Sequence, residues 1–176
     1  MYKRQDLLDQ LHDQRRGVAD VSDRPARQPA ARQELREWPA NGEHVGIVDD
    51  QALFLHGIRR VIDSQPDMSV QWLAANGAEA LEQREARPVD LILMDVQMPV
   101  LDGIAATAEV ARRFPATKVV ILTTFDDEDY VVNALSAGAS GFLLKDAQPE
   151  VLLDAIRTVA AGDAVISPRA TKRILA

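Results

Sequence analysis

Short apolar runs alternate with amphipathic stretches along the chain from His44 onward. Nearly every position in these runs is apolar, which is typical of parallel strands that helices cover on both faces. The runs are Val45–Val48, Met68–Ala74, Val89–Met94, Val119–Leu122 and Phe142–Leu144. The run Met68–Ala74 also carries the polar residues Ser69 and Gln71. We therefore expect one β-strand over each run.

Between these runs, apolar residues recur at the spacing of helices that bury one face. The sets are Leu55, Ile58, Val61 and Ile62; Ile104, Ala108 and Ala111; Val131, Ala134 and Leu135; and Leu152, Ala155, Ile156 and Val159. Gly138 stands where a helix would end, and Pro149 suits the first turn of the last helix. Strands that alternate with helices predict an α/β fold. Right-handed crossovers then favour a flavodoxin-like, doubly wound (βα)5 domain with parallel strand order 2-1-3-4-5.

The first 43 residues have a different character. They hold eight basic and eight acidic residues, so they carry no net charge, and Pro25, Pro29 and Pro39 interrupt their sparse apolar positions. We expect residues 1–43 to be a flexible N-terminal extension, with a partner-binding segment as the alternative. The folded domain is expected over residues 44–161.

Composition excludes several classes of protein. The 176 residues fit one ordinary domain with tails, and the absence of cysteine excludes disulfide scaffolds, thiol nucleophiles and cysteine-ligated metals. The net charge of −7 has the wrong sign for a domain that binds nucleic acid through its phosphates. No apolar run approaches the roughly 18–20 residues that span a bilayer, so we expect a soluble, cytoplasmic protein.

Polar residues follow four of the five expected strands directly. They are Asp49 and Asp50, Asp95, Thr123 and Thr124, and Lys145 and Asp146. Ligands of open α/β sheets bind beyond the carboxyl ends of the strands, where the strand order switches. The carboxylates of Asp49, Asp50 and Asp95 would crowd together there, so they would trap a proton or bind a cation. Oxygen-only ligands with room for water and phosphate suit Mg²⁺.

Lys145 would add a positive charge beside this metal, and Thr123 a hydroxyl, so the pocket could hold a phosphoryl group. Each residue also has a simpler interpretation. Asp49 or Asp50 could cap the helix that starts near Ala52, and Lys145 could be a solvated strand end. The coincidence of polar residues at four separate strand ends favours the site.

These residues also resemble a known family. The segments Leu93–Gly103 (LMDVQMPVLDG), Asp49-Asp50, Leu122–Thr124 and Gly141–Lys145 (GFLLK) resemble the receiver domain of two-component response regulators. The sequences of the segments Leu122–Asp127 and Gly138–Asp146 are similar to those of the NarL/FixJ type. The resemblance runs from about His44 to Ala161, and its motifs are highly specific in combination.

The resemblance implies a role for each site residue. Asp95 would be the phosphoacceptor, which takes the phosphoryl group from a phosphohistidine. Mg²⁺ would be bound directly by Asp50, Asp95 and the main-chain carbonyl of Gln97, with Asp49 acting mainly through a water. Lys145 and Thr123 would contact phosphoryl oxygens. Phe142 matches the family's switch aromatic, although by sequence alone such a residue is more often simply part of the core.

The resemblance also implies partners: a sensor histidine kinase, a second copy of the chain after phosphorylation, and DNA only through a further domain. The output face would combine the helix around 131–135, the strand Phe142–Leu144 and the helix around 152–159. Residues 162–176 look like a linker toward a helix-turn-helix domain that is missing from this chain. We do not expect the protein to be an enzyme. At most, it would be a self-phosphorylating domain with autophosphatase activity. A stand-alone regulator or a phosphorylation-independent interaction module is the alternative.

Two enzyme or cofactor classes fit less well. A phosphatase of the haloacid dehalogenase type would need a second aspartate two residues after its nucleophile, where this chain has Gln97. A flavin or dinucleotide binder would need a glycine-rich or hydroxyl-rich turn after the first strand. That turn is Asp49-Asp50-Gln51 here, which would repel phosphate unless a metal were bound.

Overall fold

The computed structural model describes residues 42–124 and 128–175. The expected N-terminal extension lies outside the described residues, apart from its last two positions. The strands are β1 (Glu43–Val48), β2 (Met68–Ala74), β3 (Leu91–Met94), β4 (Lys118–Thr123), β5 (Gly141–Leu144) and β6 (Val165–Ile166). The helices are α3 (Ala52–Asp63), α4 (Gly77–Ala86), α5 (Gly103–Arg113), α6 (Glu128–Ser136), α7 (Pro149–Ala160) and α8 (Pro168–Leu175).

The strands form one parallel sheet in the order β2-β1-β3-β4-β5-β6. This confirms the α/β fold and the expected order 2-1-3-4-5, with a sixth strand added at the edge. The third strand begins at Leu91, two residues later than expected from the apolar run that starts at Val89. Asp90 precedes this strand, and its carboxylate accepts a hydrogen bond from the main-chain N–H of His44 at 2.8 Å.

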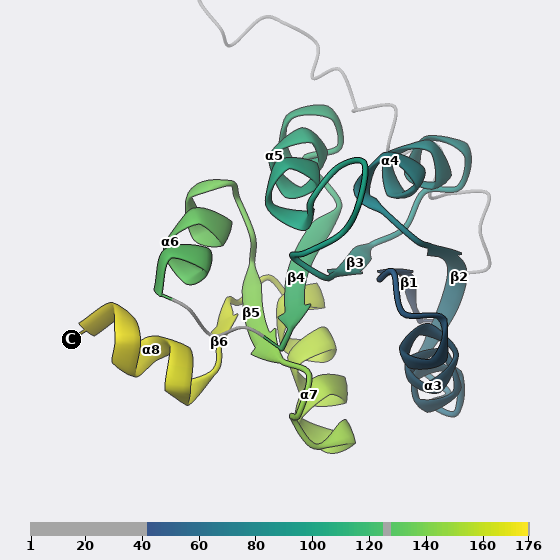
Figure 1. Cartoon of the computed structure of the whole chain (residues 1–176). Coiled ribbons are helices and arrows are strands. Elements are labelled where there is room, and N and C mark those ends of the chain that lie inside the picture. Colours follow the sequence, from purple (N-terminus) through teal and green to yellow (C-terminus); the bar gives the residue numbers. More distant parts are fainter. Residues whose placement is uncertain (1–41, 125–127, 176) are drawn as a thin grey trace, which may run out of the picture. The chain divides into compact units, whose positions relative to one another are not determined.

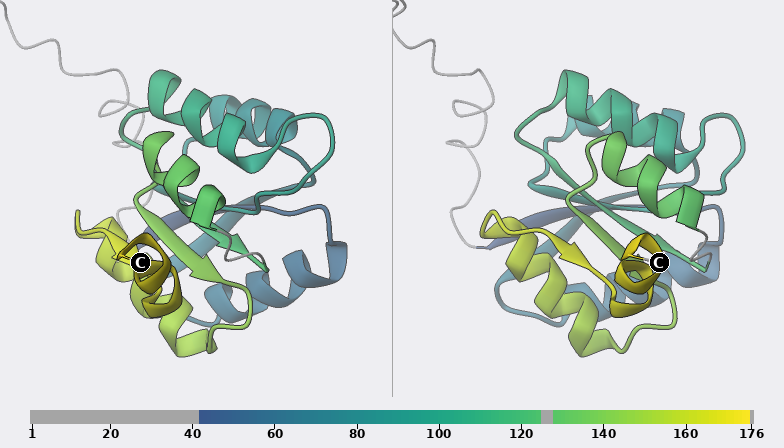
Figure 2. Two further views of the ribbon diagram at one scale, coloured as in Figure 1. Left: turned by 60° about the vertical axis from the view of Figure 1, so that its left-hand side comes forward. Right: turned by 90° about the vertical axis from the view of Figure 1, so that its left-hand side faces the viewer.

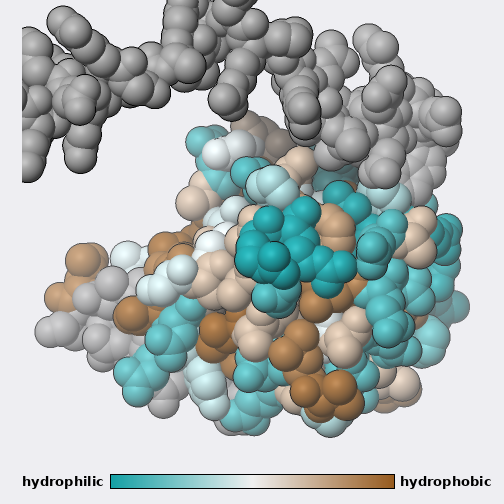
Figure 3. All heavy atoms as spheres, turned by 90° about the horizontal axis from the view of Figure 1, so that it is seen from above, coloured by the Kyte–Doolittle hydropathy of each residue, from teal (hydrophilic) through white to brown (hydrophobic). Residues whose placement is uncertain are grey.

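Helices cover both faces of the sheet (Figure 1). On one face α4, α5 and α6 pack over a buried cluster that includes Ile92, Ile121 and Phe142. On the other face α3 and α7 pack over a second cluster that includes Ile47 and Leu93. Because alternate residues of a strand point to opposite faces, neighbours such as Ile92 and Leu93 belong to different clusters. Figure 3 views the domain from the α5 side, where hydrophilic side chains gather over the centre and apolar ones form smaller patches.

Local sequence signals begin and end several helices, among them the expected Pro149 and Gly138. The side chain of Asn76 accepts a hydrogen bond from the N–H of Glu79 at 2.9 Å and so caps α4. The side chain of Asp102 caps α5 in the same way, through the N–H of Ala105 at 2.8 Å. Pro149 lies in the first turn of α7, and Gly138 takes a φ of 104° just after α6.

Within the segment expected to be a linker, the structure has a strand and a helix, β6 and α8. β6 pairs with β5, and the N–H of Ser167 donates to the carbonyl of Phe142 at 2.9 Å. Helix α8 then lies beside α6 (Figure 2), and Ala170 is fully buried in the same cluster as Phe142. Across the described residues, no helix combines the length and apolar character that crossing a membrane requires.

A glycine in β1 lets a tryptophan of β2 lie flat against the backbone. Gly46 pairs with Trp72 in the parallel register, and a Cβ at Gly46 would lie 2.5 Å from the indole ring. The ring is held from its other side, because its Nε1–H donates to the carbonyl of Arg87 at 3.0 Å. Trp72 is only 4% exposed, so it has little freedom to move aside.

We expect Gly46→Ala to lower the free energy of unfolding by about 1–3 kcal/mol, as overpacking does in other cores. Urea unfolding followed by circular dichroism measures the change. Gly57→Ala is the matched control, because nothing lies within 4 Å of a Cβ at this position in α3. That variant should gain about 0.5–1 kcal/mol from helix propensity. Equal stability of the two variants would contradict the contact.

Candidate functional site

The sheet register brings two aspartates together at the carboxyl ends of β1 and β3. These strands are neighbours, with Val48 opposite Met94, and Asp49 and Asp95 are the next residues of the two strands. The N–H of Asp95 donates to the carbonyl of Val48 at 3.0 Å, which continues the pairing to the site itself. The two carboxylates therefore leave the sheet side by side.

Lys145, which follows β5, reaches both carboxylates. Its Nζ forms an ion pair with Oδ2 of Asp49 and a second one, at 3.3 Å, with Oδ2 of Asp95. The three side chains are nearly buried, with exposed fractions of 8% for Lys145, 1% for Asp49 and 9% for Asp95. An ion pair with so little solvent is screened far less than a surface pair.

A third carboxylate completes an acidic cluster. Asp49, Asp50 and Asp95 each place one oxygen so that these atoms lie within 4.8 Å of one another. Asp50 is exposed, whereas the other two are buried. Oδ1 of Asp49 accepts a hydrogen bond from the N–H of Gln51 at 2.8 Å, but its buried Oδ2 accepts none from the described residues. A buried oxygen that has only an ion pair is suited to a cation, and oxygen ligands favour Mg²⁺.

Burial raises the pKa of the Asp95 carboxyl above its usual value, and the negative charge of Asp49 raises it further. Lys145 and the N–H of Val96, which donates to Oδ1 of Asp95 at 2.8 Å, act in the opposite direction. The net shift is still upward. The carboxylate is therefore a stronger base than an exposed aspartate, and a bound cation would relieve its repulsion with Asp49.

The other expected site residues surround this cluster in different ways. Thr123 is fully buried at the end of β4, and its carbonyl accepts a hydrogen bond from the N–H of Lys145 at 2.9 Å. Phe142 is fully buried in β5, within the cluster that α6 and α8 cover. Gln97 lies in the loop after Asp95 and is exposed. The structure thus brings Asp49, Asp50, Asp95 and Lys145 into direct proximity and places Phe142 in the core.

The loop after Asp95 is held in place by its own backbone. The N–H of Gly103 donates to the carbonyl of Val96 at 2.8 Å. A Cβ at Gly103 would collide with the carbonyl of Asp95, so only glycine allows this approach. Val100 takes a φ of 69°, a left-handed conformation that is costly for a β-branched residue. The loop is therefore shaped around Asp95 at some energetic cost.

Two contacts of the site were not predicted from the sequence. The amide of Gln97 donates to the hydroxyl of Tyr130 in α6 at 2.7 Å and links the loop to that helix. A groove of about 650 Å³ between α5 and α6 lies beside this hydrogen bond. The Nζ of Lys145 lies 4.5 Å from the ring centroid of Phe54, in α3. Both contacts depend on the directions in which side chains point. The pattern of apolar residues predicts which residues pack in the core, but it does not predict these directions.

Comparisons with known proteins find similar sequences and similar structures. Residues 45–157 match the family model of the response regulator receiver domain. The chain is 45% identical over 131 residues to YxjL of Bacillus subtilis (strain 168), an uncharacterized transcriptional regulatory protein. This match covers 74% of the chain and 60% of YxjL. The chain thus spans about 60% of the length of this curated relative.

Solved structures share the fold. A two-component response regulator of the LuxR family from Aurantimonas sp. SI85-9A1 is 30% identical with a TM-score of 0.73, over 77% of this chain and 96% of that chain. The response regulator domain of CheB from Thermotoga maritima is 31% identical with a TM-score of 0.65, over 70% of this chain and 99% of that chain.

The raised pKa of Asp95 predicts that Asp95→Asn stabilises the metal-free protein. A carboxyl whose pKa is higher in the folded chain favours folding below its unfolded-state pKa, and this contribution is lost as the pH rises through the folded-state pKa. At neutral pH we expect the variant to gain about 1 kcal/mol, or about 2–4 °C in Tm. Thermal unfolding by circular dichroism measures it.

The gain should disappear below about pH 4, where an unfolded aspartate is protonated as well. Asp163→Asn is the matched control, because Asp163 is exposed and lies outside the site. An equal gain in both variants, or a gain in Asp95→Asn that persists in acid, would show that the burial of the Asp95 charge and its repulsion with Asp49 are not the cause.

Proposed function

Because the chain belongs to the receiver domain family of two-component response regulators, of the NarL/LuxR type, we propose that Asp95 accepts a phosphoryl group from a sensor histidine kinase. The proposal rests mainly on one observation: the side chain of Asp95 lies close to those of Asp49, Asp50 and Lys145 at one edge of the sheet. Phosphoryl transfer asks a protein mainly for positioning and charge neutralisation, which this set of groups offers.

The transfer replaces one phosphorus bond by another. A carboxylate oxygen of Asp95 attacks the phosphorus of a phosphohistidine, the P–O bond of an acyl phosphate forms, and the P–N bond breaks. The departing imidazole nitrogen takes a proton from solvent. The raised pKa of Asp95 makes its oxygen more nucleophilic, and the N–H of Val96 holds the other oxygen in place. The chain is thus a phosphoacceptor and no enzyme in the ordinary sense, with autophosphatase activity at most.

The acidic cluster fits a divalent cation. Asp50, Asp95 and the main-chain carbonyl of Gln97 would hold Mg²⁺ directly, and Asp49 would hold it mainly through a water. When bound, Mg²⁺ supplies positive charge that neutralises the phosphoryl oxygens as the bond forms. Asp49 keeps its ion pair with Lys145 until the phosphoryl group arrives. Lys145 then turns to a phosphoryl oxygen, for which its flexible stem is suited.

Phosphorylation would change the shape of the output face. The Thr123 hydroxyl moves toward a phosphoryl oxygen, and Phe142 turns into the space that Thr123 leaves. The face built from α6, β5 and α7 responds, because Phe142 packs in the cluster under α6. We place this switch in a cytoplasmic transcription regulator that dimerises on phosphorylation and binds DNA through an output domain after residues 162–176. A stand-alone regulator with the same receiver is the second candidate.

A small phosphodonor tests the proposal without a kinase. With Mg²⁺ and acetyl phosphate, the mass of the chain should increase by about 80 Da, the mass of one phosphoryl group, and Asp95→Asn should abolish the increase. Mass spectrometry of the intact protein is the measurement. Asp102→Asn is the control, because asparagine still caps α5 and the variant should take up phosphate normally. The absence of any gain with several donors would favour a phosphorylation-independent interaction module.

Lys145→Ala should separate phosphorylation from its transmission. The variant keeps Asp95 and the cation site, so it should still gain the phosphoryl mass. It lacks the ammonium that follows the phosphoryl group, so we expect phosphate-dependent dimerisation to be at least tenfold weaker, equivalent to about 1.4 kcal/mol. Analytical ultracentrifugation with and without acetyl phosphate measures the dimer. Normal dimerisation of the phosphorylated variant would contradict the role given to Lys145.

A further inference from the structure

We propose that Phe54 is a positioning residue that holds the Lys145 ammonium at the phosphoryl site. The inference rests on the function proposed above and adds to it a residue of α3. The Nζ of Lys145 lies over the face of the Phe54 ring, 4.5 Å from its centroid. This is within the range in which a cation is attracted to the negative face of an aromatic ring.

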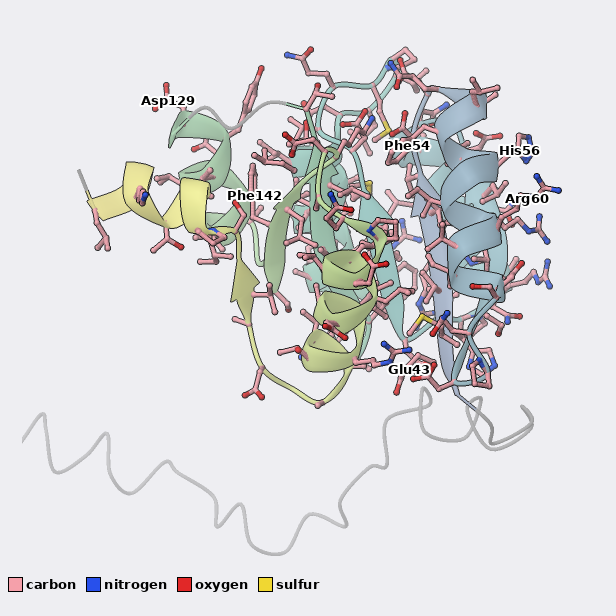
Figure 4. All side chains as sticks on the ribbon, turned by 90° about the horizontal axis from the view of Figure 1, so that it is seen from below. Glu43, Phe54, His56, Arg60, Asp129 and Phe142 are labelled. Atoms are coloured by element: carbon pink, nitrogen blue, oxygen red, sulfur yellow. The ribbon has the colours of Figure 1, made fainter. Side chains whose placement is uncertain are left out.

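Phe54 lies on the side of α3 that faces the sheet, whereas His56 and Arg60 point away from it (Figure 4). Its ring packs against the buried cluster beneath α3 and α7. With Leu122, Leu144 and Lys145 it lines a small cavity of about 40 Å³. The ring is therefore fixed by the core on one side and contacts the ammonium on the other.

The ammonium of Lys145 is thus held by two kinds of group. The carboxylates of Asp49 and Asp95 attract it from the ends of β1 and β3, and the ring of Phe54 contacts it from α3. A lysine ammonium is strongly hydrated and its stem is flexible, so without the ring it would gain more from moving into water. The Lys145 side chain is only 8% exposed, and the ring replaces part of the hydration that the ammonium loses.

This position has opposite consequences for two ligands. The ammonium occupies the carboxylate oxygens around which Mg²⁺ would bind, so a tightly held Lys145 weakens the binding of Mg²⁺ alone. The same ammonium is already placed to contact the oxygens of a phosphoryl group on Asp95, or the fluorines of the phosphoryl mimic beryllium trifluoride. It therefore strengthens the binding of this mimic. Loss of the ring should therefore strengthen the binding of Mg²⁺ alone and weaken the binding of the mimic. General damage to the site would weaken both.

Phe54→Leu keeps an apolar side chain and removes the aromatic face. We expect it to bind Mg²⁺ about two- to fivefold more tightly, and to need about two- to fivefold more beryllium trifluoride for half-saturation at saturating Mg²⁺. Isothermal titration calorimetry measures the first quantity, and titration followed by NMR spectroscopy the second. Phe54→Tyr keeps the ring and should match the wild type in both. Leu53→Ala, the neighbouring change at an exposed position of α3, should also match it.

The outcomes separate the possibilities. Unchanged binding of both ligands by Phe54→Leu, or a weakening of both, would overturn the inference. So would a Phe54→Tyr variant as altered as Phe54→Leu, or a Leu53→Ala variant with the same pair of shifts. In each of these cases a wild type that binds both ligands leaves the proposed function standing. A wild type that binds neither Mg²⁺ nor the mimic would refute the proposed function, and the role of Phe54 with it.

Discussion

The repulsion between carboxylates at the carboxyl edge of the sheet is the constraint around which this domain is built. Asp49 and Asp95 follow neighbouring parallel strands, so the hydrogen-bonded register itself forces them together. Burial, and after it the charge of Asp49, raise the pKa of Asp95 by more than Lys145 lowers it. The two apolar clusters, one on each face, supply the stability that tolerates such an edge. The negative charge of these carboxylates destabilises the protein without a ligand, and the same charge is available to bind a cation.

Much of this arrangement follows from the sequence, for a physical reason. Parallel strands end at one edge of their sheet, so polar residues after buried runs must gather there, and Asp49, Asp95 and Lys145 do so. Other features follow from packing, which periodicity does not record. The ring of Phe54 over Lys145 depends on side-chain rotamers, and the two-residue strand β6 is too short to show a period. The left-handed backbone of Val100 goes against the preference of its residue type.

The site is connected to both helical layers. Phe54 reaches it from α3 on one face of the sheet, and the hydrogen bond from Gln97 to Tyr130 connects its loop to α6 on the other. Phe142 and Ala170 extend the second connection through the core to α8. A change of charge at Asp95 thus meets packed side chains on two sides, and densely packed interiors transmit strain.

The short strand β6 has a consequence for how the molecule associates. An edge strand with a long row of free N–H and C=O groups invites strands of other molecules to pair with it, as happens in amyloid fibrils. Val165 and Ile166 end the sheet after two residues, and the chain then turns into a helix at Pro168. The β6 edge therefore offers little template for the growth of the sheet beyond this domain.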